Sequence, residues 1–511
     1  MSVFDGRVRE YSGVIVDSFT KENCYRYGRA FFLSHCHKDH MDGLGARHIV
    51  HALENGCKGL FCSPVTASLL EADPDLAHLK HHIKPLAVNQ PIIVDVKFEN
   101  AREAEFLTVT LLSANHCPGS VMFLFEGRHG AVLYSGDFRL TADDVRKMEH
   151  LHLANGTCKS LRTMYLDTTF LHPNLACIPT RETSRRIAID LIEQWKSENP
   201  AVHFVHMNCN SFGYEHVLLE VAEKFNTQIH VHPSTYASYT ALPDITKYLT
   251  TDPRSTWIHA CCWKLYKRQG VSIPCGILAP PVNGKHQVLR LKLTTMWFTK
   301  LPDGFPKDHK FYLPKFNIWR IVHSMHSSYN EICDVVGYLK PTSAYPTVIP
   351  VLSRTTQDAM KRLRDVFPHL TLAKEAECFS PPVSLLRPGL WSSRRKMQNA
   401  ESYSDTSLLG SSSPSASPLV KKKRKSLSLK KSTPVIDLQV DLSDSDDEIK
   451  IHSRTGSLPI DEVEPAASDC EDDSWHVDCS PEISPKEPAT RTLGNLFDMI
   501  FQDGHIELKK K

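Results

Sequence analysis

The sequence predicts a mixed α/β fold, because two kinds of apolar pattern alternate along roughly the first 375 residues. Short apolar runs bounded by turn residues are typical of buried strands, and they occur at 13–16, 30–33, 106–112, 121–125, 131–135 and 164–166. Apolar residues at helical spacing recur over 183–196, 214–225 and 355–366. Strands and helices that alternate in this way are typical of layered α/β domains.

Composition sets broad limits on the protein class. A chain of 511 residues can hold roughly two or three domains, and its 41% hydrophobic content is enough for a substantial core. The formal charge of +2 neither indicates nor excludes a nucleic-acid partner. Fifteen cysteines and a polar N-terminus without a secretory signal favour a reducing compartment. No apolar stretch is long enough to span a bilayer, so we expect an intracellular protein with no membrane partner.

From about residue 380 the composition shifts to serine, proline and charge, which predicts a disordered tail. The basic run 421–425 is typical of nuclear targeting or nucleic-acid contact, or of a solvated charge run. The apolar run 435–438, followed by acids, has the form of a strand-adding partner motif or a chance cluster. Helical spacing of apolar residues in 493–501 would suit docking in a partner's groove.

The segment 34–40 is the most informative part of the chain. It reads Ser-His-Cys-His-Lys-Asp-His and directly follows the strand-like run 30–33. His35 and His37 are two residues apart, so an extended chain points them to one side. Imidazole and carboxylate are ligands for zinc and similar divalent ions, although a solvated His-rich loop is the alternative. The segment predicts a metal-dependent hydrolase site.

Four more candidate ligands lie next to predicted elements. His116, Asp137 and Asp167 each follow a predicted strand, and His326 precedes an apolar stretch with helical spacing. A single strand-end aspartate is more often a turn former or a helix cap than a ligand. The joint presence of these residues therefore carries the argument.

The order of these motifs resembles the metallo-β-lactamase superfamily and, within it, the β-CASP DNA nucleases. The matching segments are 32–41, 115–125, 133–140, 165–170, 295–298 and 326–329, including Asn115-His-Cys-Pro-Gly-Ser120 and Tyr165-Leu-Asp-Thr-Thr-Phe170. The resemblance implies an αββα sandwich with an inserted β-CASP domain. It places the two lactamase parts at 1–156 and 318–375, the β-CASP domain at 157–317, and a disordered regulatory tail at 376–511.

Carried over residue by residue, the resemblance implies two metal positions. The first would be held by His35, His37, His116 and Asp137, and the second by Asp39, His40, His326 and the shared Asp137. Zinc is expected at the imidazole-rich first position, and magnesium or manganese also suits the second, which has more oxygen donors. Asp167 is expected to orient ligands or support the second metal. Asp17 matches a carboxylate that fixes an imidazole, although a simple turn acid is the alternative.

Phosphodiester hydrolysis suits this set of residues. Asp39 is the candidate to orient or deprotonate the attacking water, and Asp17, Asp167 and His326 complete the catalytic group. Ser328-x-x-Glu331 has the form of a capping box, so a helix starting there would aim backbone N–H groups at the metals. We therefore expect Ser327 and Ser328 to contact substrate phosphate, with an ordinary cap as the alternative. Lys38 would attract phosphate or remain solvated.

A second candidate metal site lies in the expected β-CASP domain. Two histidines and two cysteines would complete a closed tetrahedral zinc site, namely His230, His259, Cys261 and Cys275. By spacing alone, buried free thiols are the better explanation of the cysteines. The family resemblance implies such a structural zinc set, for which Cys262 and His232 are competing ligands.

The resemblance implies a nuclear DNA endonuclease and 5′–3′ exonuclease that opens hairpins and trims overhangs. Its expected process is double-strand break repair by non-homologous end joining and V(D)J-type recombination. The expected partners are DNA, the DNA-dependent protein kinase catalytic subunit and DNA ligase IV. Alternatives are a 5′ exonuclease for crosslink or telomere processing, an RNA-cleaving enzyme and a non-catalytic repair scaffold. The complete ligand set argues against the scaffold.

Overall fold

The structure is a computed structural model, and it describes residues 4–96, 106–200, 204–209, 211–262, 273–277, 288–301, 305–314 and 318–370. The predicted tail and its three partner motifs lie outside these ranges. Among the described helices, none combines the length and the apolar character needed to cross a membrane.

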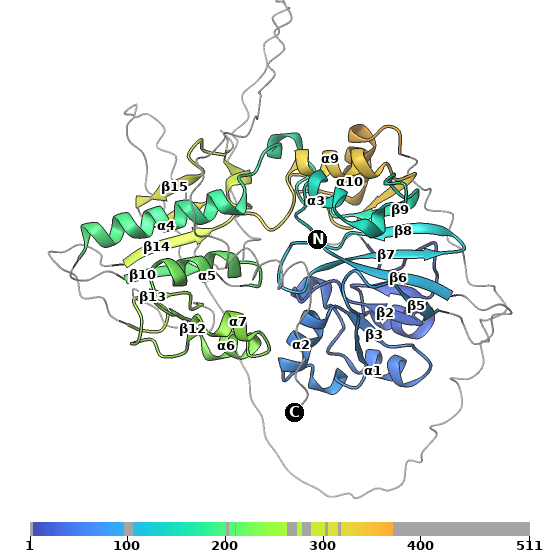
Figure 1. Ribbon diagram of the computed structural model, residues 1–511, viewed down its shortest axis with the longest axis horizontal. Helices are drawn as coiled ribbons and strands as arrows, with labels where there is room; N and C mark the ends of the chain where they lie inside the picture. The colour runs from blue at the N-terminus through green and yellow to red at the C-terminus, as the bar shows by residue number, and fades with distance from the viewer. Residues whose placement is uncertain are drawn as a thin grey trace, which may run out of the picture. The chain divides into compact units, whose positions relative to one another are not determined.

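Two stacked sheets form the centre of the lactamase-like part (Figure 1). The first has the order β1-β2-β3-β4, and all of its strands are parallel: β1 Val14–Val16, β2 Ala30–Phe32, β3 Leu60–Cys62 and β4 Ile83–Pro85. The second has the order β17-β9-β8-β7-β6-β5, with β5 Ile92–Asp95, β6 Phe106–Ser113, β7 Val121–Gly127, β8 Gly130–Tyr134, β9 Leu161–Leu166 and β17 Ser343–Pro346.

Alternating side chains explain why these strands stack in layers. Along β7, Phe123 and Phe125 turn toward the first sheet, where their rings lie 5.3 and 5.1 Å from that of Phe32. Met122 and Leu124 turn the other way, into a core shared with α9 (Tyr329–Leu339) and α10 (Thr356–Val366). On the far side of the first sheet, a separate core includes α1 (Arg47–Glu54) and α2 (Pro64–Ala72). The predicted αββα sandwich is confirmed.

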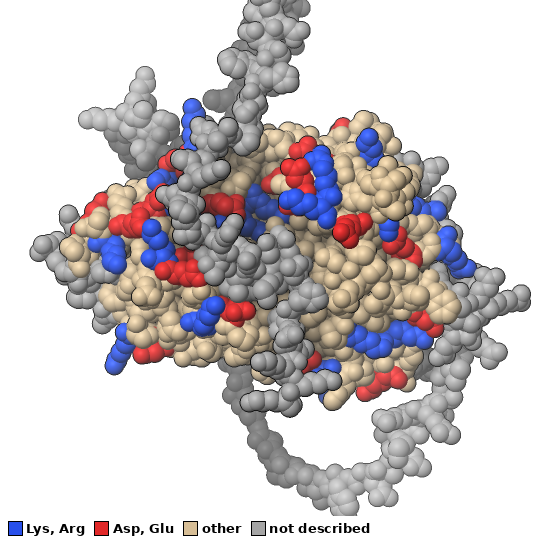
Figure 2. All heavy atoms as spheres, in the orientation of Figure 1, with Lys and Arg blue, Asp and Glu red and all other residues tan. Residues whose placement is uncertain are grey.

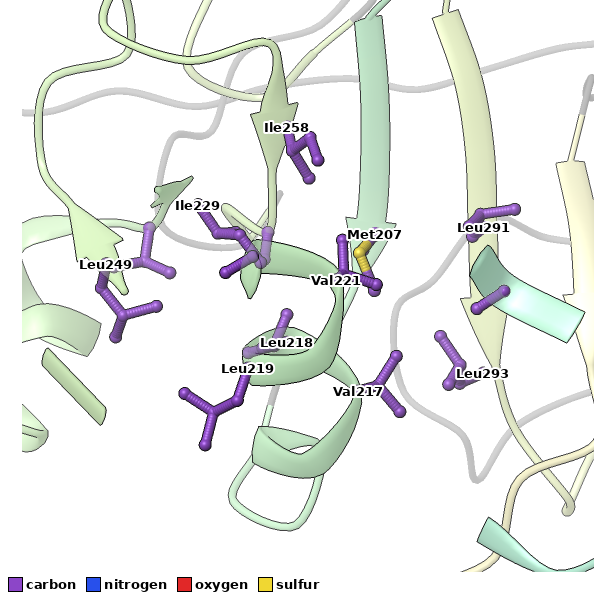
Figure 3. Close-up of a cluster of buried hydrophobic side chains, with 14 of the residues drawn as sticks. Met207, Val217, Leu218, Leu219, Val221, Ile229, Leu249, Ile258, Leu291 and Leu293 are labelled. Carbon is purple, nitrogen blue, oxygen red and sulfur yellow. The ribbon is translucent and has the colours of Figure 1, made fainter. Parts of the chain in front are cut away.

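A separate seven-stranded sheet has the order β12-β11-β13-β10-β14-β16-β15. Its strands are β10 Phe204–Asn208, β11 Ile229–His230, β12 Leu249–Thr250, β13 Ile258–His259, β14 Val288–Leu293, β15 Lys310–Leu313 and β16 Ile318–Ile321. Helices α4 (Arg181–Glu198) and α5 (Glu215–Lys224) share one apolar core with it. Figure 3 shows Val217 and Val221 of α5 within this core, beside Met207, Leu291 and Leu293 of the strands.

Shorter helices complete the described elements: η1 Asn23–Tyr27, η2 Lys38–His40, η3 Ala77–Leu79, α3 Ala142–Arg146, η4 Glu149–Leu151, η5 Pro173–Leu175, α6 Pro233–Ser238, α7 Pro243–Thr246 and η6 Phe298–Lys300. The chain leaves the six-stranded sheet after β9 and returns to it at β17, and the seven-stranded sheet lies between these strands in the sequence. The domain limits at 156/157 and 317/318 stay predictions.

Charged residues of both signs share the molecular surface. On the face drawn in Figure 2, Lys and Arg side chains are interspersed with Asp and Glu side chains. This mixture agrees with the small formal charge of +2. A nucleic-acid interface therefore has to be argued from local clusters and not from the charge of the whole chain.

Candidate metal centre

The candidate ligands come together because their strands end at one edge of the lactamase-like sandwich. Strand β6 is antiparallel to β7, and β7 is antiparallel to β8, so β6 and β8 run in the same direction, as does β9. His116, Asp137 and Asp167 follow the carboxyl ends of these three strands. In the other sheet, Asp17 and His35 follow the carboxyl ends of the parallel strands β1 and β2.

Five imidazoles and one carboxylate converge at this edge. Asp137 Oδ2 lies 3.3 Å from His40 Nε2, 3.6 Å from His116 Nε2, 3.8 Å from His35 Nε2 and 4.0 Å from His326 Nε2. The fifth ring joins through His37 Nδ1, which is 3.1 Å from His35 Nε2 and 3.0 Å from His116 Nε2. The structure thus brings together six of the seven residues predicted as ligands around the active-site metals.

The outer nitrogen of each ring is engaged in a hydrogen bond. The partners are Ser34 Oγ for His35 (2.9 Å), Phe212 O for His37 (2.9 Å), Asp17 Oδ2 for His40 (2.9 Å), Met325 O for His116 (2.9 Å) and Asp167 Oδ2 for His326 (2.8 Å). Each partner fixes the orientation of its ring and leaves the inner nitrogen facing the cluster. Such outer bonds are typical of metal-binding histidines.

The inner atoms fit a metal ion. A carbonyl oxygen can only accept, so the neutral rings of His37 and His116 carry their protons on the outer nitrogens. Their inner nitrogens are then both acceptors, although they face each other at 3.0 Å. Within the described ranges, Asp137 Oδ1 is buried and has no hydrogen-bond partner. A divalent cation would satisfy these facing lone pairs and the buried oxygen together.

The three rings of His35, His37 and His116 are held in the neutral form that a metal requires. Burial lowers the pKa of all three imidazoles, and neighbouring histidines lower it further. The pKa falls well below 6.5 for His35 and His116. These rings can therefore present lone pairs at neutral pH.

The remaining two rings are paired with carboxylates. Burial lowers the pKa of His40, but Asp137 and Asp17 outweigh it and raise that pKa well above its ordinary value. For His326, Asp167 and Asp137 outweigh burial and raise the pKa to about 9. Burial also raises the pKa of Asp137, but His40 and His326 outweigh it and hold that pKa well below its usual range. These rings must lose a proton when a cation binds.

Asp17 acts through its neighbours, as expected for a carboxylate that fixes an imidazole. Its Oδ1 accepts from the Ser34 N–H (2.7 Å), and its Oδ2 accepts from Ser34 Oγ (2.6 Å) and Tyr134 OH (3.0 Å) as well as from His40. Its φ of +51° lies in the left-handed region, which an aspartate tolerates better than most residues. The residue is thus fixed between both sheets.

Asp39 and Lys38 lie in η2, at the exposed rim of the site. The Asp39 side chain is 75% exposed, and its Oδ2 lies 3.7 Å from His40 Nε2. It is the one predicted active-site ligand that does not enter the tight donor groups among the described residues. Its position suits a group that meets solvent water at the edge of the cluster.

Hydrogen bonds within the protein engage both Ser327 and Ser328, and their expected phosphate contacts stay predictions. Ser327 N–H donates to Phe138 O, and its hydroxyl oxygen accepts from the Leu140 N–H (3.1 Å). Ser328 forms the predicted capping box with Glu331, whose Oε2 accepts the Ser328 N–H at 2.6 Å. The predicted cap is therefore present at the start of α9.

The chain is similar in sequence to known DNA repair proteins. Residues 243–351 match the family model described as DNA repair metallo-beta-lactamase. The chain is 38% identical to Protein artemis of Rattus norvegicus over 78% of this chain and 58% of that protein, and 40% identical to Protein artemis of Homo sapiens over 70% and 50%. It is 31% identical to 5′ exonuclease Apollo of Mus musculus over 63% and 51%. The chain thus spans between 50% and 58% of the length of these relatives.

The chain is therefore similar to DNA repair metallo-β-lactamases over 243–351 and to artemis proteins over 70–78% of its length. Similarity to metallo-β-lactamases implies metal binding, in agreement with the donor groups described above.

Several residues of this metallo-β-lactamase site had not been predicted. The carbonyls of Phe212 and Met325 hold His37 and His116, but backbone groups leave no sequence signal. Buried Cys117 places its sulfur within 4.8 Å of the ligand atoms of His35, His37 and His116, and its place directly after His116 was the only available signal.

Two buried arginines tie the loops of this metallo-β-lactamase site together. Arg181 donates to Asn115 O (2.6 Å), His116 O (3.2 Å) and Met325 O (3.4 Å). Arg139 donates to Ser324 O (3.0 Å). Sequence periodicity alone does not distinguish these two buried arginines from charged residues on the surface.

The part of the chain between β9 and β17 holds the second predicted donor group. His230 and His259 lie on paired strands with their Nδ1 atoms 3.1 Å apart, and Cys275 Sγ lies 3.5 Å from His259 Nδ1. Their donor atoms and Cys261 Sγ all lie within 4.8 Å of one another. A hydrogen bond from Cys261 lowers the pKa of the Cys275 thiol, and His230 and His259 lower it further. The set fits a tetrahedral zinc ion.

The competing ligands lie outside this group. His232 Nδ1 is within 2.7 Å of Ser234 Oγ and accepts the Ser234 N–H at the start of α6. Cys262 is half-buried and is not part of the described donor group.

Proposed function

We propose that this chain is a metal-dependent phosphodiesterase that cleaves DNA. The observation that carries the proposal is the convergence of four inner imidazole nitrogens on the buried Asp137 carboxylate, with the fifth, His37 Nδ1, against His35 and His116. Three mutually close, neutral imidazoles favour zinc, and the Asp137 side shared with His40 and His326 suits a second divalent ion. Magnesium or manganese is the alternative at that second position.

The residues around the proposed ions would have different roles in phosphodiester hydrolysis. A bound divalent ion lowers the pKa of water toward about 7 and neutralises charge on the phosphate oxygens. Asp39, exposed at the rim, would orient the attacking water and accept its proton. Asp17 and Asp167 hold His40 and His326 in position, so they act as positioning residues.

The finer proposal is a 5′–3′ exonuclease and structure-selective endonuclease that opens hairpins and trims overhangs. Its proposed setting is the nucleus, in double-strand break repair by non-homologous end joining and V(D)J-type recombination. Identity of 38–40% to artemis proteins, against 31% to Apollo, supports this reading. The DNA-dependent protein kinase catalytic subunit and DNA ligase IV remain proposed partners. The four-donor set at His230, His259, Cys261 and Cys275 would hold a structural zinc ion.

A simple 5′ exonuclease for crosslink or telomere processing is the second candidate. It is favoured by the 31% identity over 320 residues to a protein named 5′ exonuclease Apollo. A hairpin substrate separates the two proposals, because a hairpin has no free end at its tip for an exonuclease to enter.

The test is a nuclease assay with a labelled DNA hairpin, a 5′-phosphorylated single strand and a matching RNA. The purified chain, its His37→Ala variant and a His81→Ala control are compared, since His81 is exposed and outside the cluster. We expect His37→Ala to abolish DNA cleavage and His81→Ala to leave it unchanged. Equal product from His37→Ala and the parent would refute the proposed site, and cleavage of RNA alone would refute the proposed substrate.

A further inference from the structure

The edge of the seven-stranded sheet carries aromatic side chains that reach solvent. Strand β15 is the last strand of the sheet and pairs antiparallel with β16. Phe311 and Tyr312, neighbours on β15, are 40% and 39% exposed. Neighbouring large aromatic side chains on an exposed sheet edge are typical of a site of interaction.

Cross-strand register places aromatic and basic side chains on one face of this edge. Phe311 of β15 pairs with Arg320 of β16, and Arg320 pairs with Lys292 of β14, so the three side chains share a face. The Trp297 ring joins them, with its centroid 5.5 Å from that of Phe311 and 4.5 Å from Arg320 Cζ. We call Trp297, Phe311 and Arg320 the edge platform.

The charge around the edge platform suits a polyanion. Residues 305–314 and 318–321 contain three cationic residues, Lys307, Lys310 and Arg320, and one acid, Asp308. On the opposite face, Lys310 Nζ lies 5.5 Å above the Trp319 ring. Aromatic rings interleaved with lysine and arginine are the pattern by which proteins bind single-stranded nucleic acid, because rings stack on bases and cations contact phosphates.

The edge platform is also connected to the metal centre. Phe298, whose ring lies 5.1 Å from that of Trp297, shares an apolar cluster with Phe170. The Phe170 ring lies 5.7 Å from that of His326. In addition, Thr295 Oγ1 donates to His323 O at 2.5 Å, three residues before His326. A continuous set of contacts therefore joins the exposed rings to the loop that carries a candidate ligand.

We propose that the edge platform binds single-stranded nucleic acid adjacent to the metal centre. A base would stack on Phe311 and Trp297, while Arg320 and Lys292 would contact the flanking phosphates. This proposal rests on the proposed nuclease function and adds to it a named binding surface for the unpaired strand.

The test measures binding separately from cleavage. Anisotropy of a fluorescein-labelled oligo-dT of about 16 nucleotides is recorded in the His37→Ala background, which keeps the oligonucleotide intact. We expect Phe311→Leu to weaken binding about tenfold, since one stacking contact is lost, and Phe311→Trp to retain it. Tyr25→Leu, at another exposed aromatic residue (44%), should leave binding unchanged. Arg320→Gln should reduce the slope of log K against log salt by about 0.7.

Clear outcomes overturn the proposal. Equal affinities of Phe311→Leu and the Tyr25→Leu control would do so, as would equal losses in Phe311→Leu and Phe311→Trp. Thermal unfolding of each variant shows whether it is folded, and Phe311→Trp keeps the test valid if removal of the ring destabilises the edge. Cleavage by the chain with His37 intact tests the nuclease function independently, so failure of the one does not imply failure of the other.

Discussion

The His37 ring donates its Nε2 proton to the carbonyl of Phe212, 2.9 Å away and 175 residues further along the chain. One residue belongs to the lactamase-like part and the other follows β10 of the inserted sheet. The inserted part therefore fixes the tautomer of a candidate metal ligand. A backbone group of the inserted part thus contributes directly to the geometry of the metal centre.

A buried pair holds the Phe212 segment in place, and breaking it should weaken metal binding. Glu215 Oε2 accepts the Gly213 N–H at 2.7 Å, and Tyr239 OH donates to Glu215 Oε1. We expect Tyr239→Phe to lower active-site zinc affinity about tenfold, because the carbonyl that orients His37 loses its support. Competition with a chelator measures the affinity.

Helix α5, which carries Glu215, also provides a matched control for this prediction. Tyr248 OH donates to Glu223 Oε1 on the exposed side of α5, so Tyr248→Phe removes the same kind of bond away from the metal centre. Equal zinc affinities in Tyr239→Phe and Tyr248→Phe would show that the Phe212 segment is positioned by other means.

Asp17→Asn should weaken the metal centre more than the loss of Tyr134, one of the donors to its carboxylate. The amide can no longer accept every bond from Ser34, Tyr134 and His40, and it also removes the charge opposite His40. We expect a loss of metal affinity between about tenfold and a hundredfold. Tyr134→Phe, which removes one donor at 3.0 Å, should have a smaller effect. Metal content after gel filtration tests the order of the two variants.

Cys275→Ser should release the proposed structural zinc and leave the active-site metals bound. Serine is a weak zinc ligand, so the four-donor set loses the thiolate nearest His259. We expect the metal content to fall by about one equivalent and the melting temperature to drop. Cys57→Ser, at a half-buried thiol outside the donor groups, is the control. An unchanged metal content would argue against the structural zinc.

Because the pKa of buried His323 is lowered, we expect the protein to lose stability in acid. Burial lowers its pKa well below 6.5, and Arg181 and Arg139 lower it further. Below pH 6.5 the unfolded chain binds a proton that the folded chain excludes, so the free energy of unfolding falls as pH falls. His323→Phe keeps a ring stacked on Tyr214 and removes the contribution of this histidine to the pH dependence of stability. Between pH 7.5 and 5.5, urea unfolding should show a loss larger by about 1.4 kcal/mol in the parent than in the variant.

Periodicity predicted the strands and helices well because it reflects local burial. The run 121–125 is apolar throughout and lies within β7, where both faces of the strand are buried, and the spacing over 355–366 falls almost entirely on α10. The capping box of Ser328 and Glu331 was likewise predicted from neighbouring residues and is confirmed. The expected phosphate contact stays a prediction; only the fold revealed that Ser327 bonds to the distant Leu140 while Ser328 bonds to Glu331.

The sequence by itself determined which donors exist and which strand each one follows, because ligand chemistry and strand ends are encoded in neighbouring residues. Tertiary structure alone decided that His37 donates to the Phe212 carbonyl and that Asp17, beside the first sheet, accepts from Tyr134 of the second. It also decided that Phe311 and Arg320 share a face. These relationships join segments far apart in the chain. They depend on strand order and register, which only the packing of distant strands against one another can set.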